Sequence, residues 1–145
     1  MGGENEHYSS GARRLIVNYL GWRICPLVCY DLRFPVYSRN QNDYDCLIYS
    51  ASWPAVRNRP WEILPVARAI ENQCYVLAVN RVGTDNSGAI HDGKSVAISP
   101  KGEILANAPD GQEAIISAVL SYEELQHFRE KFPVATDADK FNIIY

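Results

Sequence analysis

The pattern of apolar and polar positions along the chain predicts alternating strands and helices. Short apolar segments bounded by turn-forming residues are typical of strands, whereas an apolar stripe at positions i, i+3, i+4 and i+7 is typical of a helix. Strands are predicted at residues 14–20, 23–29, 44–49, 74–79, 95–99, 103–106 and 113–119. Helices are predicted at residues 34–39, at residues 61–73 and after Ser121, which forms a capping box with Glu124. This order of elements indicates the α/β class.

The connections between these elements predict a mixed sheet. Gly21 and Trp22 form a tight turn between the first two strands, and residues 100–102 form another between the fifth and sixth, so both pairs are predicted hairpins. The third strand, the long helix and the fourth strand form a right-handed βαβ crossover. Residues 1–12 and 83–93 are polar and are predicted as loops.

Composition and charge narrow the class of protein. The 145 residues are 47% hydrophobic and 21% charged, which is typical of one globular domain, and the net charge is −3. Without a basic block, this balance argues against nucleic acid or an anionic membrane as the main partner. No apolar run is long enough to span a bilayer, and residues 1–6 lack the features of a signal peptide. We therefore expect a soluble, cytoplasmic protein.

The cysteines are predicted to be reduced thiols rather than disulfides or metal ligands. If Cys25 and Cys29 share a strand they lie about 13 Å apart, against about 5.5 Å between the Cα atoms of a disulfide. No Cys-x-x-Cys motif is present and the histidines are scattered singly, so no metal site is predicted. The four cysteines are Cys25, Cys29, Cys46 and Cys74.

The segment Val28-Cys29-Tyr30-Asp31 carries the sharpest chemical signal. Cys29 lies where a predicted strand bends into a helix, so its thiol is held on a sharp turn and the backbone N–H of Tyr30 can face a developing oxyanion. A nearby helix N-terminus would stabilise the thiolate. The alternative is that Cys29 is one more buried core thiol.

Several segments together resemble the nitrilase superfamily, the carbon–nitrogen hydrolases. The resemblance covers essentially the whole chain and is closest to the omega-amidase branch, which hydrolyses the side amide of short dicarboxylic acid monoamides such as 2-oxoglutaramate. The segments are RICPLVCYDLRFP (residues 23–35), SWP (52–54), ARAIENQ (67–73), NRVG (80–83), SPKGEIL (99–105) and REKFP (129–133).

The resemblance implies a mechanism and assigns its residues. Cys29 would be the nucleophile that forms a thioester and releases ammonia, with the Tyr30 amide as oxyanion donor. A second glutamate that positions the reacting groups falls on Glu4, with Glu6 as the neighbouring candidate; both are otherwise ordinary loop carboxylates. The family's general-base glutamate and its lysine belong to segments that would precede Met1. Loss of the general base, or of the lysine, typically lowers the rate by a factor of about 10²–10³. No cofactor is implied.

The resemblance also implies the architecture. The family folds as a four-layer αββα sandwich in a chain nearly twice this length, so residues 1–145 would form its C-terminal half: a single N-terminally truncated domain with a mixed sheet and helices on one face. Half a sandwich exposes apolar surface, which predicts a homo-oligomer. The alternative to an active amidase is a catalytically inactive fragment or assembly module of the same family.

Three residues are assigned to the substrate pocket. Ser52 and Trp53 would lie on a loop bordering it, although a tryptophan after a strand is by default a core aromatic. Arg33 could contact a substrate carboxylate, while an ion pair with Glu62 or Glu71 is the simpler interpretation.

Other motifs admit plain explanations. Residues 88–95 match G-x-x-x-x-G-K-[ST], but a phosphate-binding loop needs a helix directly afterwards, and an alternating strand follows here, so nucleotide binding is a remote alternative. Arg68 and Glu71 suit a local ion pair or a brace beneath the site. His91 and Asp92 suggest a base and its orienting carboxylate, or an accident of a polar loop.

Overall fold

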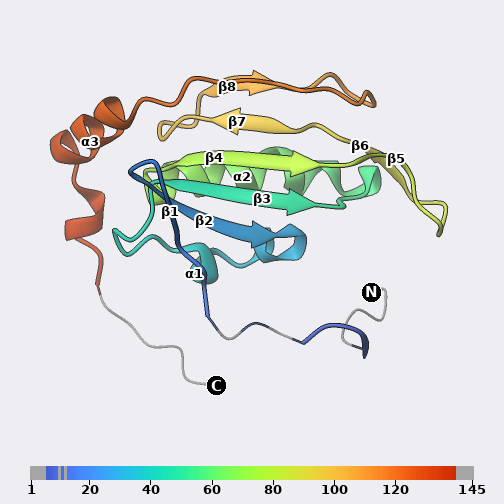
Figure 1. Cartoon of the computed structure of the whole chain (residues 1–145), viewed down its shortest axis with the longest axis horizontal. Coiled ribbons are helices and arrows are strands. Elements are labelled where there is room, and N and C mark those ends of the chain that lie inside the picture. Colours follow the sequence, from blue (N-terminus) through green and yellow to red (C-terminus); the bar gives the residue numbers. More distant parts are fainter. Residues whose placement is uncertain (1–5, 10, 12, 140–145) are drawn as a thin grey trace.

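A six-stranded mixed sheet forms the centre of the molecule. The computed structural model describes residues 6–9, 11 and 13–139 (Figure 1). The sheet has the strand order β1-β2-β3-β4-β7-β8. Its strands are β1 (Val17–Tyr19), β2 (Trp22–Val28), β3 (Cys46–Ala51), β4 (Tyr75–Asn80), β7 (Val96–Ile98) and β8 (Ile104–Asn107). A separate two-stranded hairpin consists of β5 (Val82–Thr84) and β6 (Ile90–Asp92).

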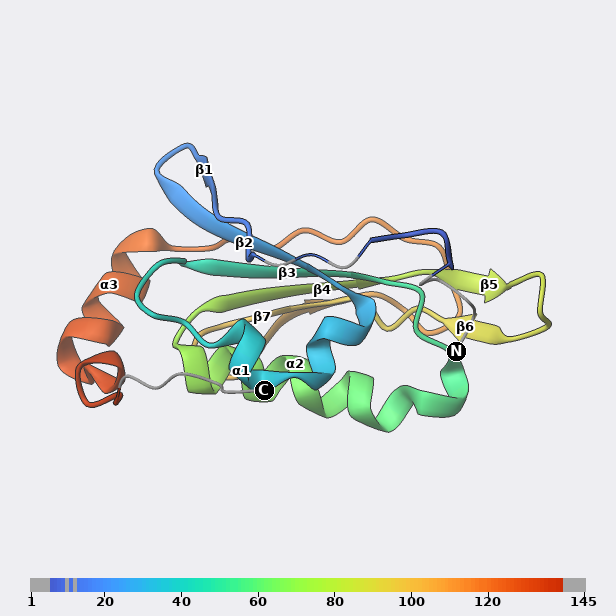
Figure 2. The same cartoon turned by 90° about the horizontal axis from the view of Figure 1, so that it is seen from below.

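The helices lie mainly on one face of this sheet. Figure 2 shows α1, α2 and the short helix after β2 on the same side, whereas α3 lies beyond one end of the strands. The α-helices are α1 (Pro35–Ser38), α2 (Asn58–Asn72) and α3 (Tyr122–Lys131). The short 3-10 helices bounded within the described residues include η2 (Cys29–Arg33), η3 (Ala55–Arg57) and η4 (Val134–Thr136).

The predicted α/β class and mixed sheet are confirmed. Strands β2, β3 and β4 are parallel, with α2 as the crossover between β3 and β4, while β1, β7 and β8 pair antiparallel. Both predicted hairpins are present, but the first turns at Leu20 and Gly21 rather than at the predicted Gly21 and Trp22, since Trp22 is the first residue of β2. In the first, Leu20 and Gly21 take φ values of +48° and +84°, the left-handed conformation that a two-residue turn of this type requires at both positions.

Alternation along the strands places the core under α2. Cys25 and Leu27 of β2, Leu47 and Tyr49 of β3, and Val76 of β4 are at most 4% exposed and pack in one cluster. The opposite face carries a smaller cluster of Cys46, Tyr75 and Leu125. Toward the carboxyl ends of the strands this second face opens, because Val28 is 64% and Val79 is 52% exposed.

Two sequence predictions of secondary structure are wrong. Residues 83–93 are not only a loop, since β5 and β6 pair there across the register Gly83 to His91. Residues 113–119 form no strand: within the described part of the chain no β-partner reaches them, and Ile115 is 98% exposed. An apolar, β-branched sequence becomes a strand only where a neighbouring strand supplies its hydrogen bonds.

A buried carboxylate anchors α3 to the end of the sheet. Asp45 is fully buried and accepts hydrogen bonds from Arg23 Nη2 at 2.6 Å and from Arg129 Nη1 at 2.8 Å. Arg129 also donates to the backbone oxygens of Gln73 and Tyr44, both at 2.9 Å. Burial alone would raise the pKa of Asp45, but the hydrogen bonds from Arg23 and Arg129 outweigh it and hold the pKa below its ordinary value.

The start of α3 agrees with its predicted cap. Ser121 Oγ accepts a hydrogen bond from the Glu124 N–H at 3.2 Å. The Ser121 N–H is bonded to the hydroxyl of Tyr75 rather than to the Glu124 side chain, so this half of the capping box is replaced by a contact to β4. The helix therefore begins where the sequence predicts, and its first turn is tied to the sheet.

All four cysteines are free thiols, as predicted. In residues 6–9, 11 and 13–139 no helix is long and apolar enough to cross a membrane. Over the same residues, no group of three or more His, Cys, Asp and Glu side chains is arranged to hold a metal ion.

Candidate active site

Cys29 lies at the bend between β2 and η2, as the sequence predicts. Its φ of +41° falls in the left-handed region, which is unusual for a residue with a β-carbon. The Asp31 carboxylate accepts a hydrogen bond from the Val28 N–H at 2.9 Å and so closes the turn around Cys29. The helix that follows is a single 3-10 segment of five residues. The backbone is therefore bent sharply to present this thiol.

The thiol contacts the loop that follows β3. Cys29 Sγ lies 3.8 Å from the carbonyl oxygen of Ser52, and Cys29 is half-buried. Strands β2 and β3 are parallel with Val28 opposite Ser50, so residues just past both strand ends meet at one edge of the sheet. This carboxyl edge is where open α/β sheets commonly place ligands.

Asn80, at the end of β4, clamps the same loop. Its Oδ1 accepts from the Trp53 N–H at 2.7 Å, and its Nδ2 donates to the Trp53 carbonyl at 3.0 Å and to the Gly93 carbonyl at 2.9 Å. Sequence reasoning assigned no role to this residue. The signal available was an asparagine closing a buried strand, which is unusual because an amide there needs several partners.

His91 contacts Ser52 and not Asp92. His91 Nε2 lies 3.2 Å from Ser52 Oγ, His91 Nδ1 lies 3.1 Å from the Ala89 carbonyl, and the residue is 3% exposed. Asp92 instead accepts from Asn58 Nδ2 at 2.5 Å. Neighbouring residues of a strand point to opposite faces, so of the two interpretations of His91 and Asp92 the base-and-carboxylate couple is excluded.

Trp53 is deeply packed in this chain. It is 3% exposed, its indole N–H donates to the Arg57 carbonyl at 2.7 Å, and its ring lies 5.6 Å from that of Trp61. The guanidinium of Arg33 lies over the Trp53 ring at 5.1 Å. The structure thus brings Trp53 and Arg33 together beside the Cys29 turn, and their roles toward a substrate stay predictions.

The ion-pair interpretation of Arg33 is wrong. Among the described residues, Glu62 pairs with Lys94 at 3.0 Å and Glu71 pairs with Arg68 at 2.9 Å. The Arg33 guanidinium instead contacts an aromatic face, which leaves its charge at the surface of the site.

Arg68 acts as the predicted brace. It is 3% exposed, pairs with Glu71 on the same helix, and donates from Nη2 to the Leu32 carbonyl at 2.8 Å. Leu32 belongs to η2, so this contact fastens the short helix after Cys29 onto α2.

The remaining predicted site residues are placed as follows. Glu4 lies outside the described residues, and Glu6 is exposed. Tyr30 is 47% exposed, with its ring 5.3 Å from that of Phe34. The assignments of Glu4 and of the Tyr30 amide stay predictions.

Residues 88–95 do not form a phosphate-binding loop. They include β6 and lead into β7, so no helix N-terminus follows Lys94. The Lys94 ammonium is instead held by Asp110 at 2.9 Å and by Glu62 at 3.0 Å. The structural requirement for nucleotide phosphates is missing, as the sequence indicates.

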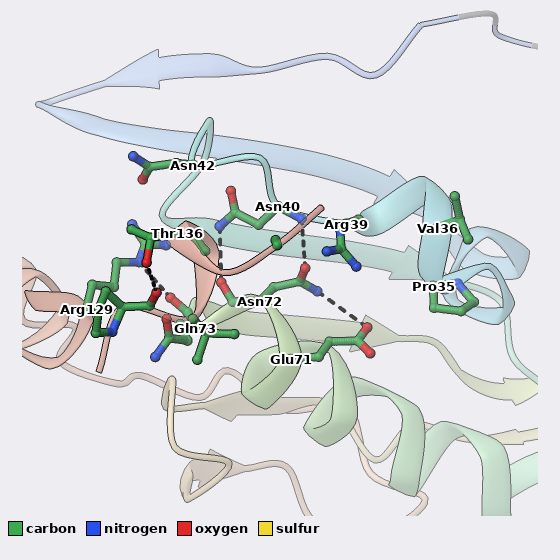
Figure 3. A pocket seen from close by; sticks show the side chains of 14 residues that line it. Pro35, Val36, Arg39, Asn40, Asn42, Glu71, Asn72, Gln73, Arg129 and Thr136 are labelled. Atoms are coloured by element: carbon green, nitrogen blue, oxygen red, sulfur yellow. Dashed lines mark hydrogen bonds between the residues drawn. The ribbon is translucent and has the colours of Figure 1, made fainter. Parts of the chain in front are cut away.

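A cavity of about 300 Å³ lies away from this site, between α1, the end of α2 and η4 (Figure 3). Its lining residues bond to one another through backbone and side-chain groups: the Asn40 backbone N–H donates to Asn72 Oδ1 at 2.7 Å, and Asn40 Nδ2 donates to the Asn72 backbone carbonyl at 3.1 Å. Cys29 does not line this cavity. Its residues join α2 to the segments around it.

Comparison with known proteins agrees with this arrangement. The family described as carbon–nitrogen hydrolase matches residues 3–130. The chain belongs to the carbon–nitrogen hydrolase family. An omega-amidase YafV of Yersinia enterocolitica is 54% identical over 144 residues, covering 99% of this chain and 56% of that protein. This similarity places the chain in the omega-amidase branch of the nitrilase superfamily, as predicted.

Two further relatives define how far the likeness reaches. A 2-oxoglutaramate amidase of Bacillus subtilis is 37% identical, covering 94% of this chain and 53% of the relative. The crystal structure of XC1258 from Xanthomonas campestris, a CN-hydrolase superfamily protein with an arsenic adduct in its active site, superposes with a TM-score of 0.93 at 40% identity. The superposed region covers 98% of this chain and 56% of the XC1258 chain. The nitrilase-like fold is confirmed, and this chain spans about half the length of the relatives it matches.

Proposed function

We propose that this chain supplies the thiol nucleophile for hydrolysis of the amide bond of a small carboxylic acid amide, a dicarboxylate monoamide such as 2-oxoglutaramate. The observation that carries the proposal is the placement of Cys29, a half-buried thiol on a strained turn at the carboxyl edge of the parallel strands. The names of relatives up to 54% identical support the reaction class and the kind of amide.

The other three thiols are unsuited to this role. Burial raises the pKa of Cys25 to about 11 and that of Cys46 to about 12. Burial also raises the pKa of Cys74 well above its ordinary value. These raised pKa values keep the three thiols protonated near neutral pH, and their burial keeps them inaccessible. Since a thiol nucleophile reacts as the thiolate, none of the three is suited to attack a substrate. Cys29 is the accessible thiol of the chain.

The proposed reaction proceeds in two stages. The Cys29 thiolate attacks the amide carbonyl carbon; an S–C bond forms, and the carbonyl electron pair moves to oxygen, which the Tyr30 N–H stabilises. When the oxyanion collapses, the C–N bond breaks, and the nitrogen takes up from water a proton equivalent to the one that the thiol released, and leaves as ammonia. Water then attacks the thioester, which releases the carboxylic acid and restores the thiol.

The proposal assigns further groups by family resemblance. Ser52, Trp53 and Arg33 border the substrate, and Glu4 is the second glutamate. The general-base glutamate and the lysine of the family belong to segments that precede the nucleophile segment, and the relatives extend to nearly twice the length of this chain. Ammonia release thus tests both the nucleophile and whether the chain acts without those two groups.

The test is release of ammonia from 2-oxoglutaramate and succinamate, together with mass detection of an acyl adduct on the protein. We expect turnover or an adduct with the unchanged chain and neither with Cys29→Ala. Cys46→Ala is the matched control, because it removes a buried thiol and should leave the signal intact once folding is verified by circular dichroism. A folded chain with neither turnover nor adduct, or a Cys29→Ala variant that retains them, refutes the proposal.

A further inference from the structure

The contact between the buried His91 and the exposed Ser52 carries an inference about substrate selection. The two residues are 39 positions apart, on β6 and after β3, and their side chains meet at 3.2 Å. Ser52 is exposed and its carbonyl contacts the Cys29 thiol, whereas the His91 ring is buried behind it. Ser52 therefore links the His91 ring to the Cys29 thiol.

The partners of His91 determine which nitrogen carries its proton. The Ala89 carbonyl, 3.1 Å from Nδ1, can only accept a hydrogen bond, so Nδ1 must be the donor. In the neutral ring Nε2 is then an acceptor with its lone pair facing Ser52. The hydrogen of the Ser52 hydroxyl consequently points at His91.

When a serine hydroxyl donates its one hydrogen to a hydrogen bond, it can act toward other groups only as an acceptor. Among the described residues, no further hydrogen bond reaches Ser52 Oγ, so its remaining lone pairs are free to accept from another donor, and Ser52 is exposed. Since the Ser52 carbonyl is 3.8 Å from Cys29 Sγ, its Oγ lies within about 8.5 Å of the sulfur by covalent geometry. A carbonyl carbon held at about 3–3.5 Å from the sulfur, with its C–N bond directed at Ser52, brings the amide nitrogen toward Ser52 Oγ.

We propose that His91 is a positioning residue that fixes Ser52 as a hydrogen-bond acceptor for the N–H of the substrate amide, so that the site selects amides over carboxylates. The inference rests on the proposed function, in which Cys29 is the nucleophile. A carboxylate offers no N–H to Ser52, and two sets of lone pairs repel each other.

The backbone of the loop is held independently of His91. Asn80 bonds both the N–H and the carbonyl of Trp53, directly after Ser52. Removing the His91 ring nitrogens should therefore free the Ser52 hydroxyl to rotate while the loop keeps its course. A change in selectivity without a change in general thiol reactivity is the signature of this arrangement.

The test compares two alkylating reagents of similar size, iodoacetamide with its amide and iodoacetate with its carboxylate. Second-order rates of Cys29 labelling are measured by peptide mass analysis, and the ratio of the two rates is divided by the same ratio for free N-acetylcysteine. We expect the normalised ratio to favour iodoacetamide by about fivefold, the size of one net hydrogen bond. It should fall to the free-thiol value in His91→Phe and in Ser52→Ala.

Two more variants complete the experiment. His91→Gln keeps an acceptor for the Ser52 hydroxyl and should retain part of the preference, while His127→Gln, an exposed histidine on α3, should leave it unchanged. Because Ser52 is exposed, Ser52→Ala tests the inference even if His91→Phe fails to fold. An unchanged ratio in folded variants, or equal slowing of both reagents, overturns the inference. Alkylation needs no amide turnover, so failed ammonia release with a selective Cys29 would count against the proposed function alone.

Discussion

Replacing Asp45 with asparagine tests whether the buried carboxylate holds α3 on the sheet. The carboxylate accepts four hydrogen bonds, three from Arg23 at 2.6–3.1 Å and one from Arg129 at 2.8 Å. Asparagine has nearly the same shape but carries no charge, and its NH₂ group faces arginine donors wherever it replaces an oxygen. Asp45→Asn therefore leaves two guanidinium groups without their counter-charge.

The expected loss of folding stability is large for a substitution that replaces one oxygen by an NH₂ group. Breaking a buried ion pair typically costs about 3–5 kcal/mol, and because the Arg23 side chain is 31% exposed we expect the lower end, about 3 kcal/mol. For a domain of this size that corresponds to a fall in Tm of roughly 10 °C. Urea unfolding followed by circular dichroism gives the free energy of unfolding, and its slope shows whether α3 is still docked.

The control for this substitution is Asp139→Asn, at an exposed aspartate, which should change stability by less than about 0.5 kcal/mol. A loss below about 1 kcal/mol in Asp45→Asn, with the slope unchanged, would refute the reasoning. It would mean that water or rearranged side chains satisfy Arg23 and Arg129 at little cost.

Three further predictions follow from features of the fold. Because the pKa of Asp45 is lowered in the folded state, its carboxylate contributes its full stabilisation above the unfolded-state pKa of about 3.9, and this contribution is lost as pH falls through the folded-state pKa. When the free energy of unfolding is measured against pH, it should therefore fall less steeply in acid for Asp45→Asn than for the unchanged chain. Ser121→Ala removes the cap of α3 and should cost about 1 kcal/mol in urea unfolding, with Ser121→Thr nearly neutral. Gly102→Ala should lower Tm, because its β-carbon would lie 2.7 Å from Ile70 Cδ1 at a φ of +86°; an unchanged Tm would contradict this.

The sequence predicts the parallel centre of the sheet well, because local and tertiary preferences agree there. Strands β3 and β4 combine β-branched or apolar residues and are buried in the way their pattern indicates. Helix α2 forms where its apolar stripe predicts, but it buries Trp61, Pro65 and Ala69, whereas Ile63 and Ile70 of the predicted stripe are 45% and 52% exposed. The prediction fails at residues 113–119, where the same apolar character is present but no neighbouring strand pairs with it in the described chain. Pairing is decided by distant parts of the chain and leaves no local signal.

The candidate site shows the same division. The bend at Cys29 could be predicted because strand, thiol and turn are adjacent in sequence. The contact of His91 with Ser52 could not, since it depends on the β5–β6 hairpin folding back over the end of β3. The adjacent Asp92 suggested a partner that strand geometry rules out. Asn80 was likewise hidden, because its partners Trp53 and Gly93 come together only in the folded chain.

The left-handed backbone at Cys29 sets stability and reactivity against each other. A φ of +41° favours glycine over a residue with a β-carbon by about 1 kcal/mol, yet glycine has no thiol. A library randomised at position 29 and sorted only for heat resistance should enrich glycine and asparagine. The same library sorted for amide hydrolysis should return cysteine. The strained backbone conformation at this position is therefore retained together with the thiol, and substitutions meant to stabilise the protein should be made at other positions.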